Sequence, residues 1–414
     1  MKQLVLKAML LVGLLALPVS AWAVDLSDLL VKKGTITQEE ADSLQKRSIA
    51  SFIDKIVFYG DFRLRLESAW YAGDDNDTKN VNRQRFRLRI GSDITEGPVL
   101  IHFLLASGTG SQTGANQDYS KLSSQKPLWI DRAYVELLHI PHLDLMTGRM
   151  ANPFFTNLTG EMVWDPDYNP EGFAEQYAMK FGEGGKVFAT AGQIVLDGGG
   201  SGAAAQWLLG YQVGTEIKMD PVGFNVAVLY YNMDHGQRGN FSQVTTQDGN
   251  TRVPPVAPTD PTNVLANPYN VVDATVGVTF KAGIPITISG EVVKNLHDTV
   301  QTATIENENT GFSAGFKIGN AGDAHTAELG YIYRSLQSDA TLADLADSDW
   351  GPNGGTNRVG HIIWTAYNFT KAAQIKLKFF DTKMKNEDLV TTKIPGSDPN
   401  AIFQRVQVDI TFKF

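Results

Sequence analysis

Four arginines stand at every second position of one short stretch of the chain, namely Arg83, Arg85, Arg87 and Arg89. Apolar side chains alternate with them, including Phe86, Leu88 and Ile90. Side chains of a β-strand point alternately to opposite faces, so this stretch predicts a strand with one basic and one apolar face. Arg63 and Arg65 repeat the pattern on the preceding stretch. Such rows of cations attract anions and set ion selectivity, and they make and break no bonds.

The segment from Gly148 to Gly172 combines acidic and aromatic side chains. Its carboxylates are Glu161, Asp165, Asp167 and Glu171, its aromatic residues include Phe154 and Trp164, and Arg149 stands near its start. A merely solvated loop does not need such aromatics, so we expect this segment to pack against other parts of the protein. Two interpretations of the arginines stay open. They form either a basic wall that faces this acidic loop across a transverse field, or a solvated wall balanced by Asp61 and Glu67.

Three other patterns that could carry chemistry are weaker. Residues 165–169 have the Asp-x-Asp-x-Asn start of a calcium-binding loop, but Pro170 stands where that loop requires glycine. His139 and His142 are close together, yet the sequence offers no evident further ligand beside them. The seven histidines give no convincing serine–histidine arrangement, so we expect no enzyme. We likewise expect no metal and no cofactor.

Strands must position these residues, and the final stretch of the chain shows a strand pattern most clearly. One alternate set is apolar, namely Val406, Val408, Ile410, Phe412 and Phe414. The set between them is polar, namely Arg405, Gln407, Asp409, Thr411 and Lys413. In a soluble sandwich the apolar face would cover a core, but a strand that ends the chain on phenylalanine favours lipid outside and water inside. The pattern resembles the terminal strand of outer-membrane β-barrels.

Similar strand patterns recur from Ile56 to the end of the chain. We count about sixteen, most of them near the roughly 9–11 residues that a tilted strand needs to cross a bilayer, and about fourteen or eighteen stay open. Short connections alternate with long ones, which is typical of outer-membrane barrels. Arginines facing lipid near the midplane would cost roughly 2–4 kcal/mol each, so the basic face should line the lumen. A barrel of about sixteen strands leaves an aqueous channel unless a loop narrows it, and residues 151–174 form the third long connection.

The composition restricts the remaining classes of function. The chain of 414 residues has no cysteine, which excludes disulfides and thiolate metal sites, and its formal charge of −9 argues against nucleic acid as a partner.

Residues 1–23 predict a cleavable signal peptide with a basic start, an apolar run and a small-x-small cleavage site. Residues 24–54 predict a short periplasmic helical extension, either solvated or used in a contact, in which Thr37 and Glu40 form a capping box. Residues 55–414 predict the barrel.

Several motifs taken in order resemble a known family. They are the run from Gly148 through Asn152 to Phe154, the run from Trp164 to Gly172, Gly290 to Asn295, Asp339 with Ala340, Asp347 to Trp350, Gly354 to Asn357, and Gly360 with His361. These runs are similar to those of the family of putative outer-membrane porins, and the resemblance spans nearly the whole mature chain except its helical start. The resemblance implies a pore whose third long loop folds inward to form a constriction. It says little about the solute.

We therefore expect an antiparallel transmembrane β-barrel of about sixteen strands in the outer membrane of a Gram-negative bacterium. Its partners would be the lipid bilayer and small hydrophilic solutes or ions that diffuse passively, and a homotrimer is expected by analogy with porins. The six arginines would line the pore, and the constriction loop would contain Arg149, Phe154, Glu161, Trp164, Asp165, Asp167 and Glu171. Two alternatives stay open: a barrel sheath of a porin–cytochrome electron conduit, whose haem a partner must supply, and an outer-membrane enzyme or adhesin. The sign of the selectivity is also open.

Overall fold

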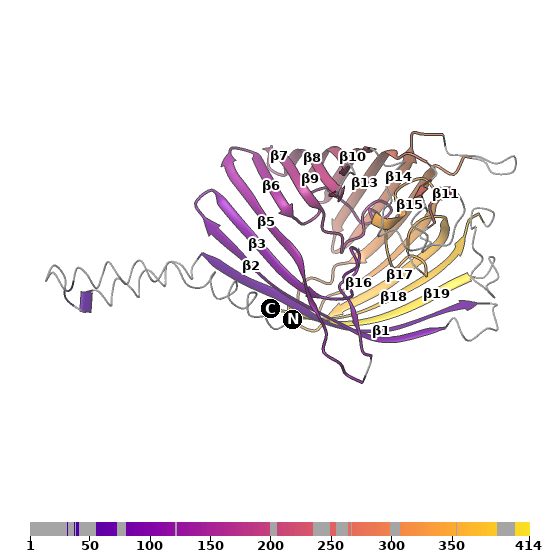
Figure 1. Cartoon of the computed structure of the whole chain (residues 1–414), viewed down its shortest axis with the longest axis horizontal. Helices are drawn as coiled ribbons and strands as arrows, with labels where there is room; N and C mark the ends of the chain where they lie inside the picture. Colours follow the sequence, from indigo (N-terminus) through magenta and orange to yellow (C-terminus); the bar gives the residue numbers. More distant parts are fainter. Residues whose placement is uncertain are drawn as a thin grey trace. The chain divides into compact units, whose positions relative to one another are not determined.

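A computed structural model describes most of the chain (Figure 1). The described residues are 31, 37, 39–40, 55–72, 80–120, 122–198, 205–234, 249–253, 264–265, 267–298, 307–352, 354–386 and 402–414. The chain divides into two compact units, one of Met1–Phe58 with Ser92–Gly97 and one of Tyr59–Gly91 with Pro98–Phe414. The second unit contains the site, and the two units are considered separately.

Sixteen long strands form a closed antiparallel β-barrel, and all of them belong to the second unit except Ile56–Phe58 of β1 and Ser92–Glu96 of β2. They are β1 (Ile56–Ala72), β2 (Val81–Glu96), β3 (Val99–Ser107), β5 (Leu128–Ile140), β6 (Leu143–Arg149), β7 (Glu171–Phe181), β8 (Gly185–Asp197), β9 (Gln206–Lys218), β10 (Val222–Asp234), β13 (Asn270–Ala282), β14 (Ile284–Asn295), β15 (Thr310–Gly319), β16 (Ala327–Leu336), β17 (Arg358–Asn368), β18 (Ala373–Met384) and β19 (Ile402–Lys413). The expected barrel and strand number are confirmed.

Short elements accompany these strands. The two-residue strand β4 (Gln117–Asp118) pairs with β2, so that Asp118 lies beside Arg85. Strands β11 (Arg252–Val253) and β12 (Val264–Leu265) pair with each other, and a 3-10 helix, η2, spans Ala343–Leu345. No helix among the described residues is long and apolar enough to cross a membrane.

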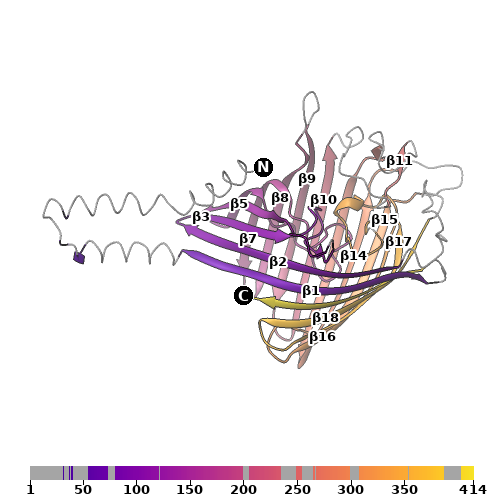
Figure 2. The same cartoon turned by 60° about the horizontal axis from the view of Figure 1, so that its bottom comes forward.

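The first and last strands close the barrel and lie side by side in Figures 1 and 2. Leu64 pairs with Ile410, and Phe62 pairs with Phe412. The side chains of Ile410, Phe412 and Phe414 are exposed on the outer face, whereas Asp409 and the other polar residues between them are mostly buried or half-buried on the inner face. This alternation is the one expected from the sequence, and it places apolar groups where a barrel meets lipid.

Three long connections matter for the interior, and we name them by their order along the chain: loop 2 (residues 108–127), loop 3 (residues 150–170) and loop 7 (residues 337–357). Loop 3 is shorter than expected, because β7 begins at Glu171 and not at Glu175. Paired glycines, Gly148 and Gly172, stand one residue inside the ends of its two flanking strands, and their φ angles are 121° and 143°. A Cβ atom on Gly172 would lie 2.0 Å from the carbonyl oxygen of Gln193, so this close approach of strands requires glycine.

An apolar cluster inside the barrel holds loops 3 and 7 against the wall. From loop 3 it takes Phe154, Met162, Val163, Trp164 and Tyr168, from loop 7 Ala340, Leu342 and Leu345, and from the strands residues such as Leu208, Tyr231 and Val293. Phe154 stacks on Trp164 with ring centroids 5.3 Å apart, and Trp164 stacks on Tyr168 at 5.9 Å. The core therefore lies between the wall and its inward-folded loops, on one side of the lumen. Loop 3 packs as expected from its aromatic residues, and its inward fold is the one that the resemblance to porins implies.

The first unit is described only in part. Lys55 and Glu96 form an ion pair at 2.7 Å, and the N–H of Thr95 donates to the carbonyl oxygen of Lys55 at 3.0 Å. The Oγ1 of Thr37 accepts from the N–H of Glu40 at 3.2 Å, while the Oε2 of Glu40 accepts from the N–H of Thr37 at 2.8 Å. These are the reciprocal hydrogen bonds of a capping box. The expected signal peptide and almost all of the extension at residues 24–54 lie outside the described residues.

Candidate functional site

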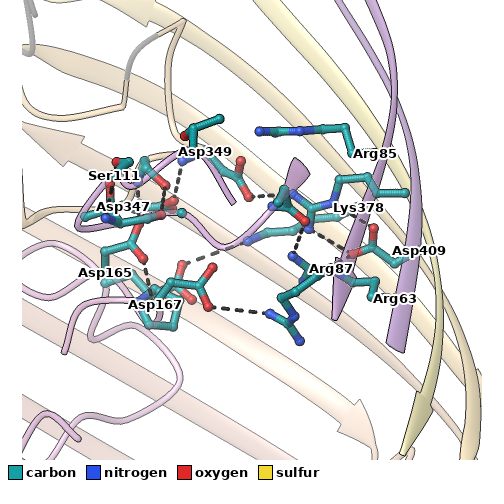
Figure 3. A pocket seen from close by; sticks show the side chains of 18 of the residues that line it. Arg63, Arg85, Arg87, Ser111, Asp165, Asp167, Asp347, Asp349, Lys378 and Asp409 are labelled. Carbon is teal, nitrogen blue, oxygen red and sulfur yellow. Dashed lines mark hydrogen bonds and ion pairs between the residues drawn. The ribbon is translucent and has the colours of Figure 1, made fainter. Parts of the chain in front are cut away.

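A cavity of about 920 Å³ lies inside the barrel between one stretch of wall and the three loops. The wall side consists of residues from β1, β2, β18 and β19, and the facing side consists of residues from loops 2, 3 and 7. Figure 3 shows the arginines Arg63, Arg85 and Arg87 on the wall side, opposite Asp165 and Asp167 of loop 3. The two sides thus carry opposite charge.

All six arginines singled out in the sequence line this cavity. Arg63 and Arg65 come from β1, and Arg83, Arg85, Arg87 and Arg89 come from β2. They share one face because each strand alternates, and their apolar neighbours point the other way. Leu66 and Ile90, for example, are 58% and 45% exposed on the outer surface. The basic face therefore borders the cavity.

Carboxylates on the same wall partly neutralise this row. Asp61 on β1 binds two of the arginines, with its Oδ1 2.9 Å from a terminal nitrogen of Arg87 and its Oδ2 2.6 Å from one of Arg89. Glu67, also on β1, forms ion pairs with Arg83 and with Arg85, the second at 3.6 Å. The interpretation of a wall balanced by Asp61 and Glu67 therefore has a structural basis, and it applies together with the acidic loop opposite.

Loop 3 brings its acidic residues to the cavity. The Oδ1 of Asp167 lies 3.5 Å from a terminal nitrogen of Arg87, so one ion pair spans the space between loop and wall (Figure 3). Asp165 accepts hydrogen bonds at 2.8 Å from the backbone N–H groups of Asp167 and of Ser348 in loop 7. Burial raises the pKa of Asp165 well above its usual range, and the charges of Asp167 and Asp347 add to the shift. Asp165 thus ties loop 3 to loop 7.

Loop 7 supplies a second set of carboxylates to the cavity, Asp344, Asp347 and Asp349. Asp347 lies 3.0 Å from Arg334, and Asp349 lies 3.3 Å from both Arg65 and Arg405. Burial, reinforced by the charge of Glu161, raises the pKa of Asp347 to about 6. Burial also disfavours ionised Asp349, but the charges of Arg65 and Arg405 hold its pKa well below the usual range. Loop 7 therefore carries one carboxylate that titrates near neutrality and one that stays charged.

Glu161 of loop 3 and Lys378 of β18 face each other at the edge of the cavity, 3.9 Å apart. Glu161 also lies 3.6 Å from Arg334. Although burial opposes ionisation, the charges of Lys378 and Arg334 hold the pKa of Glu161 below its usual range. The carboxylate of Glu161 therefore stays charged in the cavity.

The other residues assigned to the constriction loop lie in loop 3 or at its ends but do not line the cavity. Phe154 and Trp164 are 4% and 3% exposed, and they anchor loop 3 in the apolar cluster instead of reaching the cavity. Arg149 and Glu171 stand opposite each other at the ends of β6 and β7 and form an ion pair at 3.0 Å. They hold together the strands that flank loop 3, and neither lines the cavity.

Several cavity residues were not anticipated from the sequence. They are Asp344, Asp347 and Asp349 of loop 7, Lys376 and Lys378 of β18, and Arg405, Asp409 and Lys413 of β19. The alternation of polar residues in the last strand already placed Arg405, Asp409 and Lys413 on its inner face, and Lys376 and Lys378 have the same spacing. Nothing in the sequence of loop 7 distinguishes a loop that folds into the barrel from one that extends into solvent.

Of the side chains that line the cavity directly, ten are arginine or lysine and seven are carboxylates, while Asp61, Glu67 and Asp118 behind them pair with the arginines of β2. Partial protonation of Asp347, whose pKa is about 6, makes the lining more positive at mildly acidic pH.

Among the described residues no group of three or more histidine or acidic side chains is arranged to hold a metal ion. In the segment that begins like a calcium loop, Asp165 accepts from backbone N–H groups, and Asn169 donates to Asp131 at 2.9 Å.

Comparisons with known proteins agree with this architecture. The model of the family described as "Putative porin" matches residues 74–251 and 232–414. Pseudomonas putida OprB, in a high-pH structure, is similar with a TM-score of 0.54 at 10% identity, over 89% of this chain and 96% of that one. Salmonella typhi OmpF, in a complex with daunomycin, gives a TM-score of 0.48 at 12% identity, over 87% of this chain and 97% of that one. A search of curated proteins found no match. At this identity the likeness to OprB concerns the fold alone.

Proposed function

The chain belongs to the putative-porin family, and from that premise we propose that it lets small hydrophilic solutes diffuse passively across the outer membrane, with a preference for anions. The family and the barrel fold indicate an outer-membrane channel, and a channel rather than an enzyme. The solute class and the preference are our proposal. The observation that carries the preference is the excess of basic over acidic side chains among those that line the cavity directly.

Loops 3 and 7 together would form the constriction. In support of this, Asp165 and Asp167 of loop 3 and Asp347 and Asp349 of loop 7 lie on one side of the cavity, opposite arginines of β1 and β2. Opposed rows of fixed charge create a transverse field, which orients dipolar solutes and favours ions of one sign. Because the basic row is longer than the acidic one, the mean potential in the constriction would be positive.

The proposal predicts a size limit as well as a charge preference. Folded protein reconstituted into liposomes should allow small neutral sugars to enter and swell the vesicles, and the rate should fall with sugar size. A small organic anion should enter faster than a cation of equal size. Liposomes that carry the protein yet swell no faster than protein-free liposomes would refute passive diffusion.

The electron-conduit alternative requires a haem-bearing partner, because the chain has no cysteine for haem attachment. Purification from native membranes with an absorbance scan for haem separates the two functions. A stoichiometric haem protein bound to the barrel would favour the conduit and would leave the lumen blocked to sugars.

The homotrimer and the signal peptide stay predictions. The mass of the detergent-solubilised assembly tests the first, and the N-terminal residue of the mature protein tests the second.

A further inference from the structure

The inner face of the wall carries a second polar cluster away from the cavity, which we call the oxygen cluster. Its members are Asp273 and Thr275 of β13, Ser289 and Glu291 of β14, and Ser313 of β15. Glu291 lies in its centre, because the strand register pairs it with Thr275 on one side and with Ser313 on the other. Directly paired residues have Cβ atoms roughly 4.5–5.5 Å apart, so these side chains converge.

The oxygen cluster is deeply buried, and most of its oxygens have no hydrogen-bond donor among the described residues. Each of the five side chains is at most 4% exposed. Six of their oxygen atoms make no hydrogen bond: Oδ1 of Asp273, Oγ1 of Thr275, Oγ of Ser289, both carboxylate oxygens of Glu291 and Oγ of Ser313. Buried polar atoms in folded proteins almost always have a partner, and orphaned ones often mark a bound water or ion.

Neither carboxylate of the oxygen cluster forms an ion pair with a lysine, arginine or histidine in the described part of the chain, although the two carboxyls interact with each other. The nearest arginine in the register, Arg334, stands opposite Ser313, and its charge also acts on Glu291. Arg334 is shared, however, with Asp347 at 3.0 Å and Glu161 at 3.6 Å. Two buried carboxylates with only this one shared cation nearby would be costly.

We propose that the oxygen cluster binds one hard divalent cation of the calcium class within the barrel wall. Such a cation accepts six to eight oxygen ligands at about 2.3–2.6 Å in flexible geometry, including bidentate carboxylates. Its charge balances both carboxylates, whereas a shared proton would balance one and would leave the hydroxyl oxygens unused. Mg²⁺ fits less well because it demands nearly regular octahedral geometry and keeps its waters.

The cation would also stiffen the wall on which loop 3 rests. Asn157 of loop 3 donates from Nδ2 to the carbonyl oxygen of Val276 at 3.0 Å, next to Thr275. Binding to the folded barrel alone stabilises it in proportion to the logarithm of the cation concentration. This inference concerns metal binding and not conduction, so its test is independent of the channel proposal.

The test is calorimetric titration of CaCl₂ into the full-length folded barrel in detergent, after removal of metals with a chelator. We expect one calcium per chain, and we expect Glu291→Gln and Asp273→Asn to weaken binding by at least about tenfold. The matched control is Glu328→Gln, because Glu328 already has Lys317 at 3.5 Å and the Trp364 indole nitrogen at 3.0 Å. That variant should bind calcium as the wild type does.

Ser313→Ala provides a milder variant in case the carboxylate variants do not fold. It should bind calcium more weakly than the wild type, and calcium should raise the unfolding temperature of the wild type more than that of Ser313→Ala. Equal calcium binding by wild type and Glu291→Gln would overturn the proposal. A wild type that binds no calcium would also overturn it. If Glu291→Gln were in that case more stable than the wild type in the presence of a chelator, the two carboxyls would share a proton instead.

Discussion

Arg65 and Asp409 lie directly opposite each other across the seam where the first and last strands close the barrel. Their contact is bidentate, with Nε to Oδ1 at 2.7 Å and the second guanidinium nitrogen to Oδ2 at 2.8 Å. Both side chains line the cavity and both are largely buried. The pair therefore stabilises the closure of the barrel, and it contributes two charged groups to the lining of the proposed channel.

Asp409→Ala should destabilise the barrel. Removing one member of a buried ion pair leaves the other charge undercompensated, which typically costs about 3–5 kcal/mol, although Asp349 still lies 3.3 Å from Arg65. Urea unfolding of the detergent-solubilised barrel measures the loss. The control is Asp323→Ala, whose pair with Lys371 is exposed and should contribute roughly 0–1 kcal/mol. If Asp409→Ala lost no more unfolding free energy than Asp323→Ala, the Arg65–Asp409 contact would be dispensable.

Replacing Arg85 and Arg87 by glutamate should move the reversal potential in a salt gradient toward that of cations. The double change converts two positive charges of the cavity lining into negative ones and so removes the surplus of basic side chains. Planar-bilayer recording measures the shift. Lys371→Glu, in an exposed turn between β17 and β18, changes the charge of the chain without touching the cavity and should leave the potential unaltered. An unchanged potential in the double variant would reduce the arginines to a structural role.

The anion preference should rise as the pH falls through about 6. Asp347 has a raised pKa of about 6, so its carboxylate is charged above that pH and neutral below it. Protonation removes one negative charge from the lining, so the balance of charge there becomes more positive. Reversal potentials measured across this pH range give the profile, and Asp347→Asn should flatten it. Asp349→Asn should retain the step, because the pKa of Asp349 is held low and this carboxylate does not titrate there.

Trp164→Ala should release loop 3 from the wall. The indole stacks between Phe154 and Tyr168 at the centre of the apolar cluster, and truncating a buried aromatic costs about 3–5 kcal/mol. A loosened loop should give noisier and larger single-channel currents and faster proteolysis within residues 150–170. Phe173→Ala removes an aromatic ring that is 51% exposed on the outer face and should change neither property. Identical currents from Trp164→Ala and the wild type would show that loop 3 does not narrow the lumen.

The strands and the basic face were predictable from the sequence because both follow from local alternation. In β2 arginine occupies every second position from Arg83 to Arg89. Such an alternation places all four arginines on the same face of the sheet, whichever strands lie beside β2. The alternation in β19 likewise placed Asp409 inside and Phe412 outside.

The cavity as a whole was not predictable, because it depends on contacts between residues far apart in the sequence. Whether loop 7 folds inward is decided by Leu342 and Leu345 packing against strands such as β9 and β10, and by the hydrogen bond from Ser348 to Asp165. Neither contact leaves a periodic signal. The oxygen cluster was missed for the same reason, since Thr275, Glu291 and Ser313 become neighbours only through the strand register.

The central claim is an open, anion-preferring channel, and single-channel recording in a planar bilayer under a salt gradient tests it most directly. The folded wild-type protein should give discrete conductance steps, with a reversal potential displaced toward that of the anion. Steps with a potential displaced toward the cation would contradict the role given to the arginine wall. Folded protein that inserts without any conductance would contradict the channel itself.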